Sequence, residues 1–386
     1  MKRRNECWAL SRLAGLLVPM VLMCASVASV SCRMTPEGVV SVSSDVSDPK
    51  MTGFSQESKD TLVLVFSEEV ELSSLEVRKG DKENQGDIVL AASGINVQSE
   101  NRESLVATDG EESVSMENQG MEARIQFLDT TKLEAGETYI LSGVAHDQEG
   151  NSLLFQVPFH GYNDEAAGLV LSEVRSGYSK PKVEYVELYV HRSGDLAGIS
   201  LYFTNKDFEY VFPSAKVSAG DYIVLHMRAL EGETGRVDEV GDDLNLSTAS
   251  ESCSNARDFW APSTSRIVGT NDVIVLRERQ NGKVVDALLY AQSGISDAVS
   301  KRLIPVAQQM VDEGVWSGSV DFSTWASGED LSDTATTRSL SRQNIAAITD
   351  AEKAERPVLV GSSTDWMVVK GATPGKANST ERYVKK

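Results

Sequence analysis

Short strand-like runs of apolar residues, separated by turn-forming residues, constrain the fold of this 386-residue chain more than any other feature. Residues 61–66 are almost entirely apolar, as in a buried strand, and residues 123–127 alternate strictly between apolar and polar. The alternation returns from residue 169 onward, whereas residues 296–313 are the one clear helical stretch. These patterns predict an all-β protein with one or two short helices.

Length and charge limit the number of domains and the classes of partner. The chain is too long for one ordinary β-sandwich and suits two domains. Its formal net charge is −20. Phosphate binding relies on clustered Lys and Arg, so we expect no nucleic-acid partner.

Residues 1–31 have the pattern of a signal peptide. Basic residues stand at the start, an apolar run extends from Leu13 to Val30, and small residues follow. The run contains Pro19 and is short for a membrane span, and no later run reaches the roughly 20 apolar residues that a spanning helix needs. We therefore predict an exported chain.

Cys32 is the candidate for membrane attachment. The sequence Ser29-Val-Ser-Cys32 resembles a bacterial lipobox, in which the cysteine becomes the lipidated first residue, although Ser29 stands where Leu is usual. Each buried acyl methylene contributes about 0.8 kcal/mol, so palmitate and similar chains would anchor the protein firmly. The prediction is a lipoprotein at the periplasmic or outer surface of a bacterial envelope. The alternative is a secreted protein, cleaved after Ser29 or Ser31.

Residues 32–55 and 56–160 form a predicted tether and a predicted first domain. The tether is rich in Ser, Val, Asp and Thr and has no periodicity. The first domain contains Phe66-Ser-Glu-Glu-Val70 near its start and two motifs near its end, Leu133-Glu-Ala-Gly-Glu-Thr-Tyr-Ile-Leu141 and Gly143-Val-Ala-His-Asp-Gln-Glu-Gly-Asn151. In these motifs it resembles the bacterial Ig-like domains of cell-envelope proteins. Tyr139 and Leu141 are expected to share the inward face of a strand.

Asp147, Glu149 and Asn151 raise the question of a calcium site in this first domain. Clustered oxygens suit Ca²⁺, but a calcium site needs about six or seven of them and three are visible. A tight turn, in which Asp and Asn bond their own backbone, is the favoured interpretation. We expect no cofactor and assign no metal site.

Residues 169–378, which follow a linker at 161–168, carry a set of short motifs in a fixed order. The set begins with Leu169-Val-Leu-Ser-Glu-Val174 and Glu184-Tyr-Val-Glu-Leu-Tyr189, continues through 217–225, 271–276 and 281–286, and ends with Ser339-Leu-Ser-Arg342, Asp365-Trp366 and Thr373-Pro-Gly-Lys-Ala-Asn378. In this order the motifs resemble a lamin tail domain, an immunoglobulin-like β-sandwich that bacteria attach to many exported proteins. The resemblance implies two immunoglobulin-like β-sandwiches in tandem.

The same resemblance implies structural roles for several residues of the second domain. Glu187 matches a glutamate that supports the neighbouring turn, although Val190 stands where the family usually has Asn. Arg342 is expected to donate to backbone carbonyls or to a carboxylate near the end of the chain, and Pro374 with Gly375 to make the closing turn. The residues that match the family motifs are Glu187, Arg342, Trp366, Thr373, Pro374, Gly375 and Asn378.

Two segments depart from the family pattern. Residues 229–265 form a predicted polar insert in a loop of the sandwich, and residues 296–313 a predicted helix with Asp297 as its cap. A second short helix is predicted at 344–353. Phe259 and Trp260 in the insert are expected to pack on the sandwich. In an alternative interpretation, Trp260, Trp316 and Trp325 are exposed contact residues on which a ligand stacks.

The sequence contains no recognisable catalytic pattern. Its four histidines lack zinc-site spacing, and phosphate-binding, dinucleotide-binding and nucleophile-elbow motifs are absent. Glu184 and Glu187 lie on opposite faces of one strand, and nothing near Cys253 in the sequence resembles an activating base. We predict a non-catalytic envelope lipoprotein that binds a protein or a surface polysaccharide. The alternatives are a glycan or small-ligand module, and a hydrolase with an unrecognised site.

Overall fold

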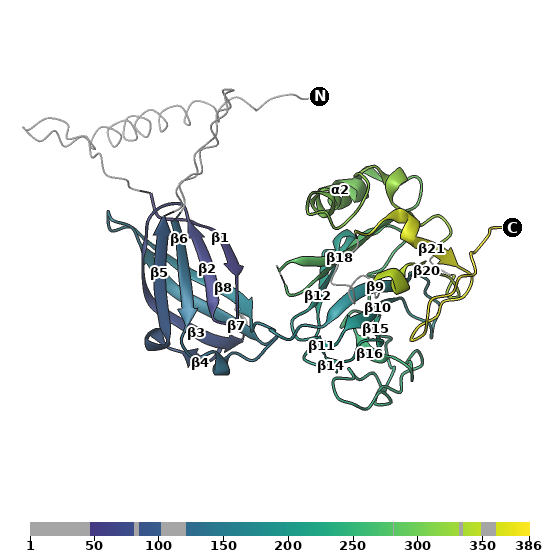
Figure 1. Ribbon diagram of the computed structural model, residues 1–386, viewed down its shortest axis with the longest axis horizontal. Helices are drawn as coiled ribbons and strands as arrows, with labels where there is room; N and C mark the ends of the chain where they lie inside the picture. Colours follow the sequence, from purple (N-terminus) through teal and green to yellow (C-terminus); the bar gives the residue numbers. More distant parts are fainter. Residues whose placement is uncertain (1–46, 81–84, 102–120, 281, 332–334, 349–359) are drawn as a thin grey trace, which may run out of the picture. The chain divides into compact units, whose positions relative to one another are not determined.

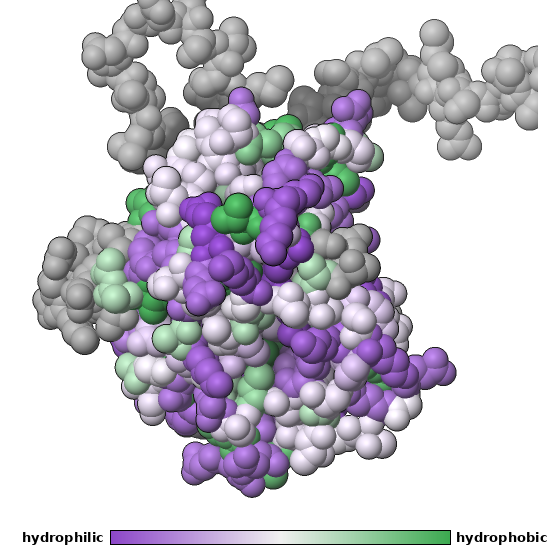
Figure 2. Space-filling model, turned by 90° about the vertical axis from the view of Figure 1, so that its right-hand side faces the viewer, coloured by the Kyte–Doolittle hydropathy of each residue, from purple (hydrophilic) through white to green (hydrophobic). Residues whose placement is uncertain are grey.

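The computed structural model of the chain describes residues 47–80, 85–101, 121–280, 282–331, 335–348 and 360–386 (Figure 1). The predicted signal peptide, Cys32 and the first part of the predicted tether lie outside these residues. Within the described ranges, no helix is long and apolar enough to cross a membrane. On the face drawn in Figure 2, hydrophilic residues predominate and hydrophobic ones are scattered among them.

Two four-stranded antiparallel sheets form the first sandwich. One sheet has the order β1-β2-β6-β5 and the other β4-β3-β7-β8. Their strands are β1 (Met51–Gln56), β2 (Thr61–Phe66), β3 (Glu71–Gly80), β4 (Gln85–Leu90), β5 (Ile95–Asn101), β6 (Met121–Phe127), β7 (Thr138–His146) and β8 (Ser152–His160). Short 3₁₀ turns, η1 (Ala92–Gly94) and η2 (Thr130–Lys132), connect some of them.

The core of the first sandwich is apolar and draws on both sheets. Leu62 and Leu64 of β2 meet Tyr139 and Leu141 of β7, and all four are fully buried. The inward orientation predicted for Tyr139 and Leu141 is therefore confirmed. The hydroxyl of Tyr139 accepts a hydrogen bond from the backbone N–H of Glu134 at 2.8 Å, so its one polar atom is satisfied at the edge of the core.

The predicted tether is too long at its C-terminal end. Residues 51–55 belong to β1, which pairs with β2 from Met51↔Phe66 to Gln56↔Leu62. Met51 and Phe54 pack against the core. The strand lies at the edge of its sheet and only one of its six residues is buried, so its sequence lacks the apolar alternation that marks a more central strand.

The second sandwich pairs a six-stranded sheet with a five-stranded one. The sheet orders are β16-β15-β10-β9-β20-β21 and β13-β12-β17-β18-β19, with a small ribbon β11-β14 beside them. The strands are β9 (Gly168–Arg175), β10 (Tyr185–Arg192), β11 (Gly194–Asp195), β12 (Ser200–Phe203), β13 (Phe208–Val211), β14 (Lys216–Val217), β15 (Tyr222–His226), β16 (Arg257–Trp260), β17 (Asp272–Arg277), β18 (Val284–Ala291), β19 (Ala326–Ser327), β20 (Ser339–Arg342) and β21 (Trp366–Val369). The prediction of an all-β protein with two β-sandwiches is confirmed.

One apolar core fills the second sandwich. It joins Leu188 and Val186 of β10 to Leu201 of β12 and Ile274 of β17, all fully buried. Buried apolar residues from both sheets therefore face one another, as in other β-sandwiches. The connections between the strands contain further 3₁₀ turns, η3 (Thr204–Lys206), η4 (Phe322–Thr324) and η5 (Ser363–Asp365).

The predicted helix is present as α2 (Asp297–Asp312). Leu303 and Met310 are fully buried, and Val299 and Val306 pack against the same core. Ser296, and not Asp297, occupies the capping position, while Asp297 lies in the first turn, where the helix dipole favours a negative charge. Of the second predicted helix, residues 345–348 are helical and 349–353 lie outside the described residues.

The predicted insert is not a loop throughout. Its residues 257–260 form β16, which adds parallel to β15 at the edge of the six-stranded sheet. All four residues of β16 are buried, including Phe259 and Trp260, so the expectation that these two pack on the sandwich is confirmed. The sequence did not predict β16, because the segment around it is polar and its own first two residues, Arg257 and Asp258, are charged.

Candidate functional site

The three tryptophans considered as contact residues are not accessible. Trp260, Trp316 and Trp325 are 8%, 2% and 4% exposed. The indole N–H of Trp260 donates to Ser247 Oγ at 3.1 Å, and that of Trp325 to the carbonyl of Ser319 at 3.2 Å. A stacking platform must present an open ring face, so the interpretation of these residues as exposed contacts is wrong.

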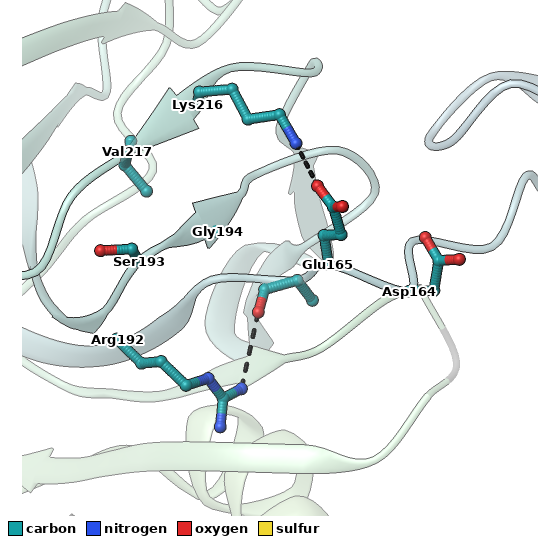
Figure 3. Close-up of a pocket in the computed structure, with 8 residues that line it drawn as sticks. Asp164, Glu165, Arg192, Ser193, Gly194, Lys216 and Val217 are labelled. Carbon is teal, nitrogen blue, oxygen red and sulfur yellow. Dashed lines mark hydrogen bonds and ion pairs between the residues drawn. The ribbon is translucent and has the colours of Figure 1, made fainter. Parts of the chain in front are cut away.

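Surface depressions lie around the second sandwich. A depression of about 530 Å³ is lined by residues 164–166, 192–194 and 216–217 (Figure 3). Both of its basic side chains have partners: Lys216 forms an ion pair with Glu165, and Arg192 donates to the backbone carbonyl of Ala166. A second cleft, of about 390 Å³, lies between residues 250–253 and 371–374. A third, of about 370 Å³, lies between residues 233–238 and the end of β16.

The residues of the closing motif converge on one buried cluster. Glu187 Oε2 accepts the N–H of Gly375 at 2.6 Å, and its Oε1 accepts the hydroxyl of Ser172 at 2.8 Å. Asn378 donates to the carbonyls of Ser172 and Arg342 at 3.0 and 2.8 Å. Glu187 therefore supports the closing turn near the end of the chain, and not the neighbouring turn that the resemblance implied. The predicted turn at Pro374 and Gly375 is confirmed.

Glu173 is the central acceptor of this cluster, and sequence reasoning missed it. Its carboxylate accepts the N–H of Thr373 at 3.0 Å and the hydroxyls of Ser339 and Ser341 at 2.5 and 2.8 Å. The available signal was an acid in the run 169–174, in which Ser172 is the one other residue that is not apolar. Such a residue must find partners when its strand is buried on both faces.

Glu173 and Glu187 oppose each other on the paired strands β9 and β10, and both are fully buried. Burial first, and then the charge of Glu173, raises the pKa of Glu187 well above its usual range. Two adjacent carboxylates are the arrangement of an acid–base pair, but these bond backbone N–H groups and hydroxyls within the fold. Through these hydrogen bonds the two carboxylates hold the end of the chain against the sheet.

Arg342 and Asp286 join the two sheets of the second sandwich. Arg342 Nη1 donates to Asp286 Oδ2 at 2.5 Å and to the carbonyl of Leu171 at 3.3 Å. Both side chains are almost fully buried, and the guanidinium lies 5.5 Å from the ring centre of the buried Trp366. The expected carbonyl partner is present. The carboxylate partner lies on β18 of the opposite sheet, however, and not near the end of the chain.

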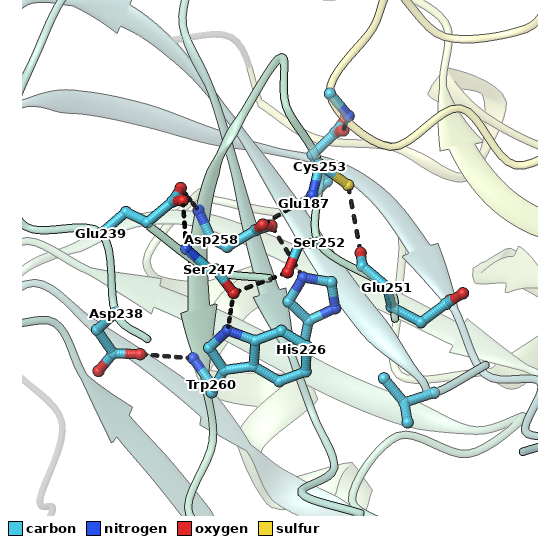
Figure 4. Close-up of polar contacts among 12 residues, drawn as sticks. Glu187, His226, Asp238, Glu239, Ser247, Glu251, Ser252, Cys253, Asp258 and Trp260 are labelled. Carbon is cyan, nitrogen blue, oxygen red and sulfur yellow. Dashed lines mark hydrogen bonds and ion pairs between the residues drawn. The ribbon is translucent and has the colours of Figure 1, made fainter. Parts of the chain in front are cut away.

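The insert is held by a buried network centred on Asp258 (Figure 4). Asp258 Oδ1 lies 2.9 Å from His226 Nε2, and its Oδ2 accepts the N–H of Cys253 at 2.7 Å. The N–H of Asp258 donates to Glu239 Oε2 at 2.9 Å. The imidazole of His226 stacks on the ring of Trp260 with centroids 4.0 Å apart. Both members of the His226–Asp258 pair are closed to solvent, so the pair joins the insert to β15.

Further bonds extend this network into the irregular part of the insert. Glu239 Oε1 accepts the N–H of Ser247 at 3.1 Å, and Asp238 Oδ1 accepts that of Trp260 at 2.8 Å. Burial raises the pKa of Asp238 and of Glu239. Backbone N–H groups that no strand partner can satisfy are thus bonded by carboxylates. The insert has little regular secondary structure, but these hydrogen bonds fix its conformation.

Cys253 is a half-buried free thiol at one side of this network. Burial, and then the negative charge of Asp258, raises its pKa to about 12. Nucleophilic cysteines react as thiolates, and this thiol stays protonated at neutral pH. The geometry around Cys253 therefore provides no activated nucleophile.

The turn between β7 and β8 is the tight turn favoured by the sequence. Asp147 Oδ1 accepts the backbone N–H of Asn151 at 2.7 Å, and its Oδ2 accepts the side-chain amide of Asn151 at 2.6 Å. Glu68, Asp147 and Glu149 bring carboxylate oxygens within 4.8 Å of one another. Asn151 therefore acts as a donor to Asp147, and Glu68 is the third acid that the sequence analysis did not include.

Comparisons with known proteins identify the second sandwich as a member of a family. Residues 167–368 match the model of a family described as "protein second domain", and the chain belongs to this family. An uncharacterized protein of Treponema pallidum (strain Nichols) is 38% identical over 172 residues, or 43% of this chain and 42% of that protein. The chain thus matches less than half the length of this relative. A crystal structure of a DUF4785 family protein from Legionella pneumophila covers 61% of this chain and 55% of its own, at 13% identity and a TM-score of 0.20.

Proposed function

We propose that this chain is a non-catalytic lipoprotein of a bacterial cell envelope whose second sandwich binds another protein or a surface polymer. The observation that carries the proposal is the insert at 229–265. Its buried network holds a long irregular segment in one arrangement, and loops positioned by a rigid scaffold are the usual carriers of binding. Its surface exposes the apolar side chains of Val237, Val240 and Leu246.

We also propose that the second sandwich is a lamin tail domain and the first a bacterial Ig-like domain. In support, the motif residues Glu187, Arg342, Gly375 and Asn378, which are far apart in the sequence, contribute to one buried polar region. A shared structural task explains why these residue types occur together in a fixed order. The family match at 167–368 covers most of the same segment.

Among the alternative functions, glycan or small-ligand binding on Trp260, Trp316 and Trp325 loses its support because all three rings are buried. A hydrolase is not favoured by the two carboxylates Glu173 and Glu187 or by the His226–Asp258 pair. These groups are buried and bond elements of the fold. Binding of a protein is favoured by the exposed apolar residues of the insert.

Attachment through Cys32 is tested by phase partitioning and by palmitate labelling. Acyl chains on Cys32 transfer apolar surface into the membrane, so the wild-type chain should enter the detergent phase and Cys32→Ala the aqueous phase. Cys253→Ala serves as the matched control, because its thiol is part of the folded domain, and it should partition as wild type. Unchanged partitioning of Cys32→Ala would show that the lipoprotein proposal is wrong.

Protein binding through the insert is tested by photo-crosslinking in the envelope of the source organism. A photoreactive residue at position 240 should give a discrete adduct with another protein, because Val240 is 47% exposed on the insert. The control position is 304, because Ile304 on α2 is 37% exposed and outside the insert. Equal adduct patterns from both positions would contradict a binding role for the insert.

A further inference from the structure

We infer that the insert binds a protein segment that combines a Lys or Arg side chain with neighbouring apolar residues. This inference rests on the proposed function and specifies the chemistry of its partner. It depends on three features of residues 229–265, all of which the structure describes: their charge, their exposed apolar side chains and the cleft beside β16.

The charge of the insert selects a cationic partner. Residues 229–265 contain eight acidic and two basic residues, which gives a formal net charge of −6. Two of the acids, Glu239 and Asp258, are buried and bonded within the network. Others, including Asp242 and Asp243, are exposed. Anionic polymers are repelled by this surface, and a second copy of the chain, with its net charge of −20, offers poor complementarity.

The apolar side chains select a protein segment over a simple cation. Across the described parts of the chain, nine large hydrophobic residues are exposed, and three of them lie between positions 237 and 246. Val237, Val240 and Leu246 are 41%, 47% and 45% exposed. Single exposed apolar residues are ordinary, but a group on one ordered segment is typical of an interaction surface.

The cleft between residues 233–238 and the end of β16 suits one cationic side chain. It has a volume of about 370 Å³, and its walls include Glu233, Asp238, Trp260 and Pro262. Glu233 Oε1 is bonded by Ser250, while its Oε2 is buried without a hydrogen-bond partner. A cation in the cleft gains charge-assisted contacts with carboxylates.

Arg236 lines the same cleft but does not satisfy Glu233. Its Nε lies 4.0 Å from Glu233 Oε2, too far for a hydrogen bond, and this Nε also lacks a hydrogen-bond partner. Oε2 is itself closed to solvent, so a donor from outside reaches the Glu233 carboxylate only when Arg236, whose side chain is 29% exposed, moves aside. An arginine or lysine of the partner can then pair with Glu233, and its apolar neighbours can contact the exposed Val237.

The test uses the full chain and three synthetic peptides labelled for fluorescence anisotropy. One peptide alternates Lys and Leu with Gly spacers, the second has Glu in place of Lys, and the third has Ser in place of Leu. The Lys–Leu peptide should bind, the Lys–Ser peptide should bind more weakly, and the Glu–Leu peptide should not bind. Tight binding of the Glu–Leu peptide, or equal binding of the Lys–Leu and Lys–Ser peptides, would overturn the inference.

Variants locate the binding on the insert. Glu233→Gln should weaken binding of the Lys–Leu peptide on the order of tenfold, because a desolvated partner of the cation loses its charge. Asp242→Asn with Asp243→Asn should weaken it less, because these acids are exposed. The matched control is Asp312→Asn with Glu313→Gln at the end of α2, which changes the net charge by the same amount as the Asp242 and Asp243 pair. An equal loss in this control would show non-specific attraction and overturn the inference.

The outcomes separate this inference from the proposed function. Failure of all peptides to bind, with a discrete cross-link from position 240 in cells, rejects the cationic partner and retains a binding role for the insert. Peptide binding without any cross-link rejects the proposed function. Val240→Ser, which keeps the network intact, should weaken binding even if Glu233→Gln disturbs the fold, and unchanged affinity of this variant contradicts the apolar contact.

Discussion

The two sandwiches have similar layers but place polar groups differently. Each packs two sheets around an apolar core. Among the described residues, twenty-one polar or charged residues are buried, and only Gln56 and Asp147 belong to the first sandwich. The other nineteen lie in the second, where they include Glu173, Glu187 and Arg342.

This difference follows from what each sandwich has to hold in place. The described part of the first sandwich is mainly strands and short turns, whose backbone groups pair within sheets. The second sandwich must also hold the insert and the last residues of the chain, whose backbone groups form few hydrogen bonds to neighbouring strands. Carboxylates such as Glu239 and Glu187 supply those bonds from inside the domain. The second sandwich should therefore be far more sensitive to single polar substitutions.

The largest difference is expected for an arginine in each sandwich. Arg342→Met leaves Asp286 buried without its cationic partner and should destabilise the second sandwich by about 3–5 kcal/mol. Arg78→Met removes a pair with Glu76 whose side chains are 31% and 32% exposed, and should cost less than about 1 kcal/mol. Denaturant unfolding followed by tryptophan fluorescence measures the second sandwich, because four of the five tryptophans lie there.

The control for Arg342→Met is hydrogen exchange in the first sandwich, which should be unchanged because distant sites act independently. Similar losses for the Arg342 and Arg78 variants would contradict the contrast between the two domains. Loss of exchange protection in both sandwiches after Arg342→Met would show that they unfold as one unit.

Trp366→Ala tests the same region through apolar packing. Trp366 is 5% exposed in β21 and belongs to the core of the second sandwich. Its removal should cost about 3–5 kcal/mol, as for other large aromatic residues in cores. The thermal transition of the second sandwich reports the loss, and Tyr162→Ala in the linker provides a partly exposed aromatic control. An unchanged transition for Trp366→Ala would contradict its role in the core.

Strands with a clear apolar pattern were predictable from the sequence. Residues 61–66 and 123–127 became β2 and β6, and residues 296–313 became α2 with its bounds nearly correct. The pattern fails in β1, which lies at a sheet edge with only one buried residue, and in β16, whose four buried residues include the charged Arg257 and Asp258. In both strands, pairing with a neighbouring strand stabilises an extended conformation that the local sequence does not predict.

The candidate site was only partly predictable for a related reason. The closing motif was recognisable, and Trp366, Pro374 and Gly375 lie as expected. The acceptor Glu173 and the partner Asp286 were missed, because their bonds to Thr373 and Arg342 join residues 200 and 56 positions apart, and such distant pairs leave no characteristic spacing in the sequence. The cleft beside β16 depends on how the insert folds back, which the sequence order does not reveal.

The two sandwiches should respond to pH with opposite signs. Burial raises the pKa of Asp272, in β17, from 3.8 to about 7, so between these values the folded state holds more protons than the unfolded state. The contribution of Asp272 to stability is therefore full below about pH 4 and falls as pH rises to 7, by at most about 1.4 kcal/mol per pH unit. The raised pKa of Glu187 acts in the same direction.

In the first sandwich, desolvation of Asp147 is outweighed by hydrogen bonds from Asn151, which lower its pKa. Its contribution is present above the unfolded value and is lost as pH falls through the folded value. Hydrogen exchange in β17 and in β7, measured from pH 4 to 8 and corrected for intrinsic rates, separates the two responses. Asp272→Asn should flatten the slope for β17 only. A slope that persists in this variant would assign the pH response to other groups.

The smallest expected difference is between two glycines that both adopt positive φ. Gly375 has φ +73° in the closing turn, and an added Cβ would lie 3.1 Å from Cβ of Ala256. Gly150 has φ +93° in the turn after β7, and a Cβ there meets nothing within 4 Å. The left-handed conformation costs an L-residue about 1–2 kcal/mol in both turns. Gly375→Ala should cost about 1 kcal/mol more than Gly150→Ala, because the crowded turn must also shift away from Glu187. Equal losses in denaturant unfolding would show that the closing turn adapts freely, and would weaken the view that buried carboxylates fix the end of the chain.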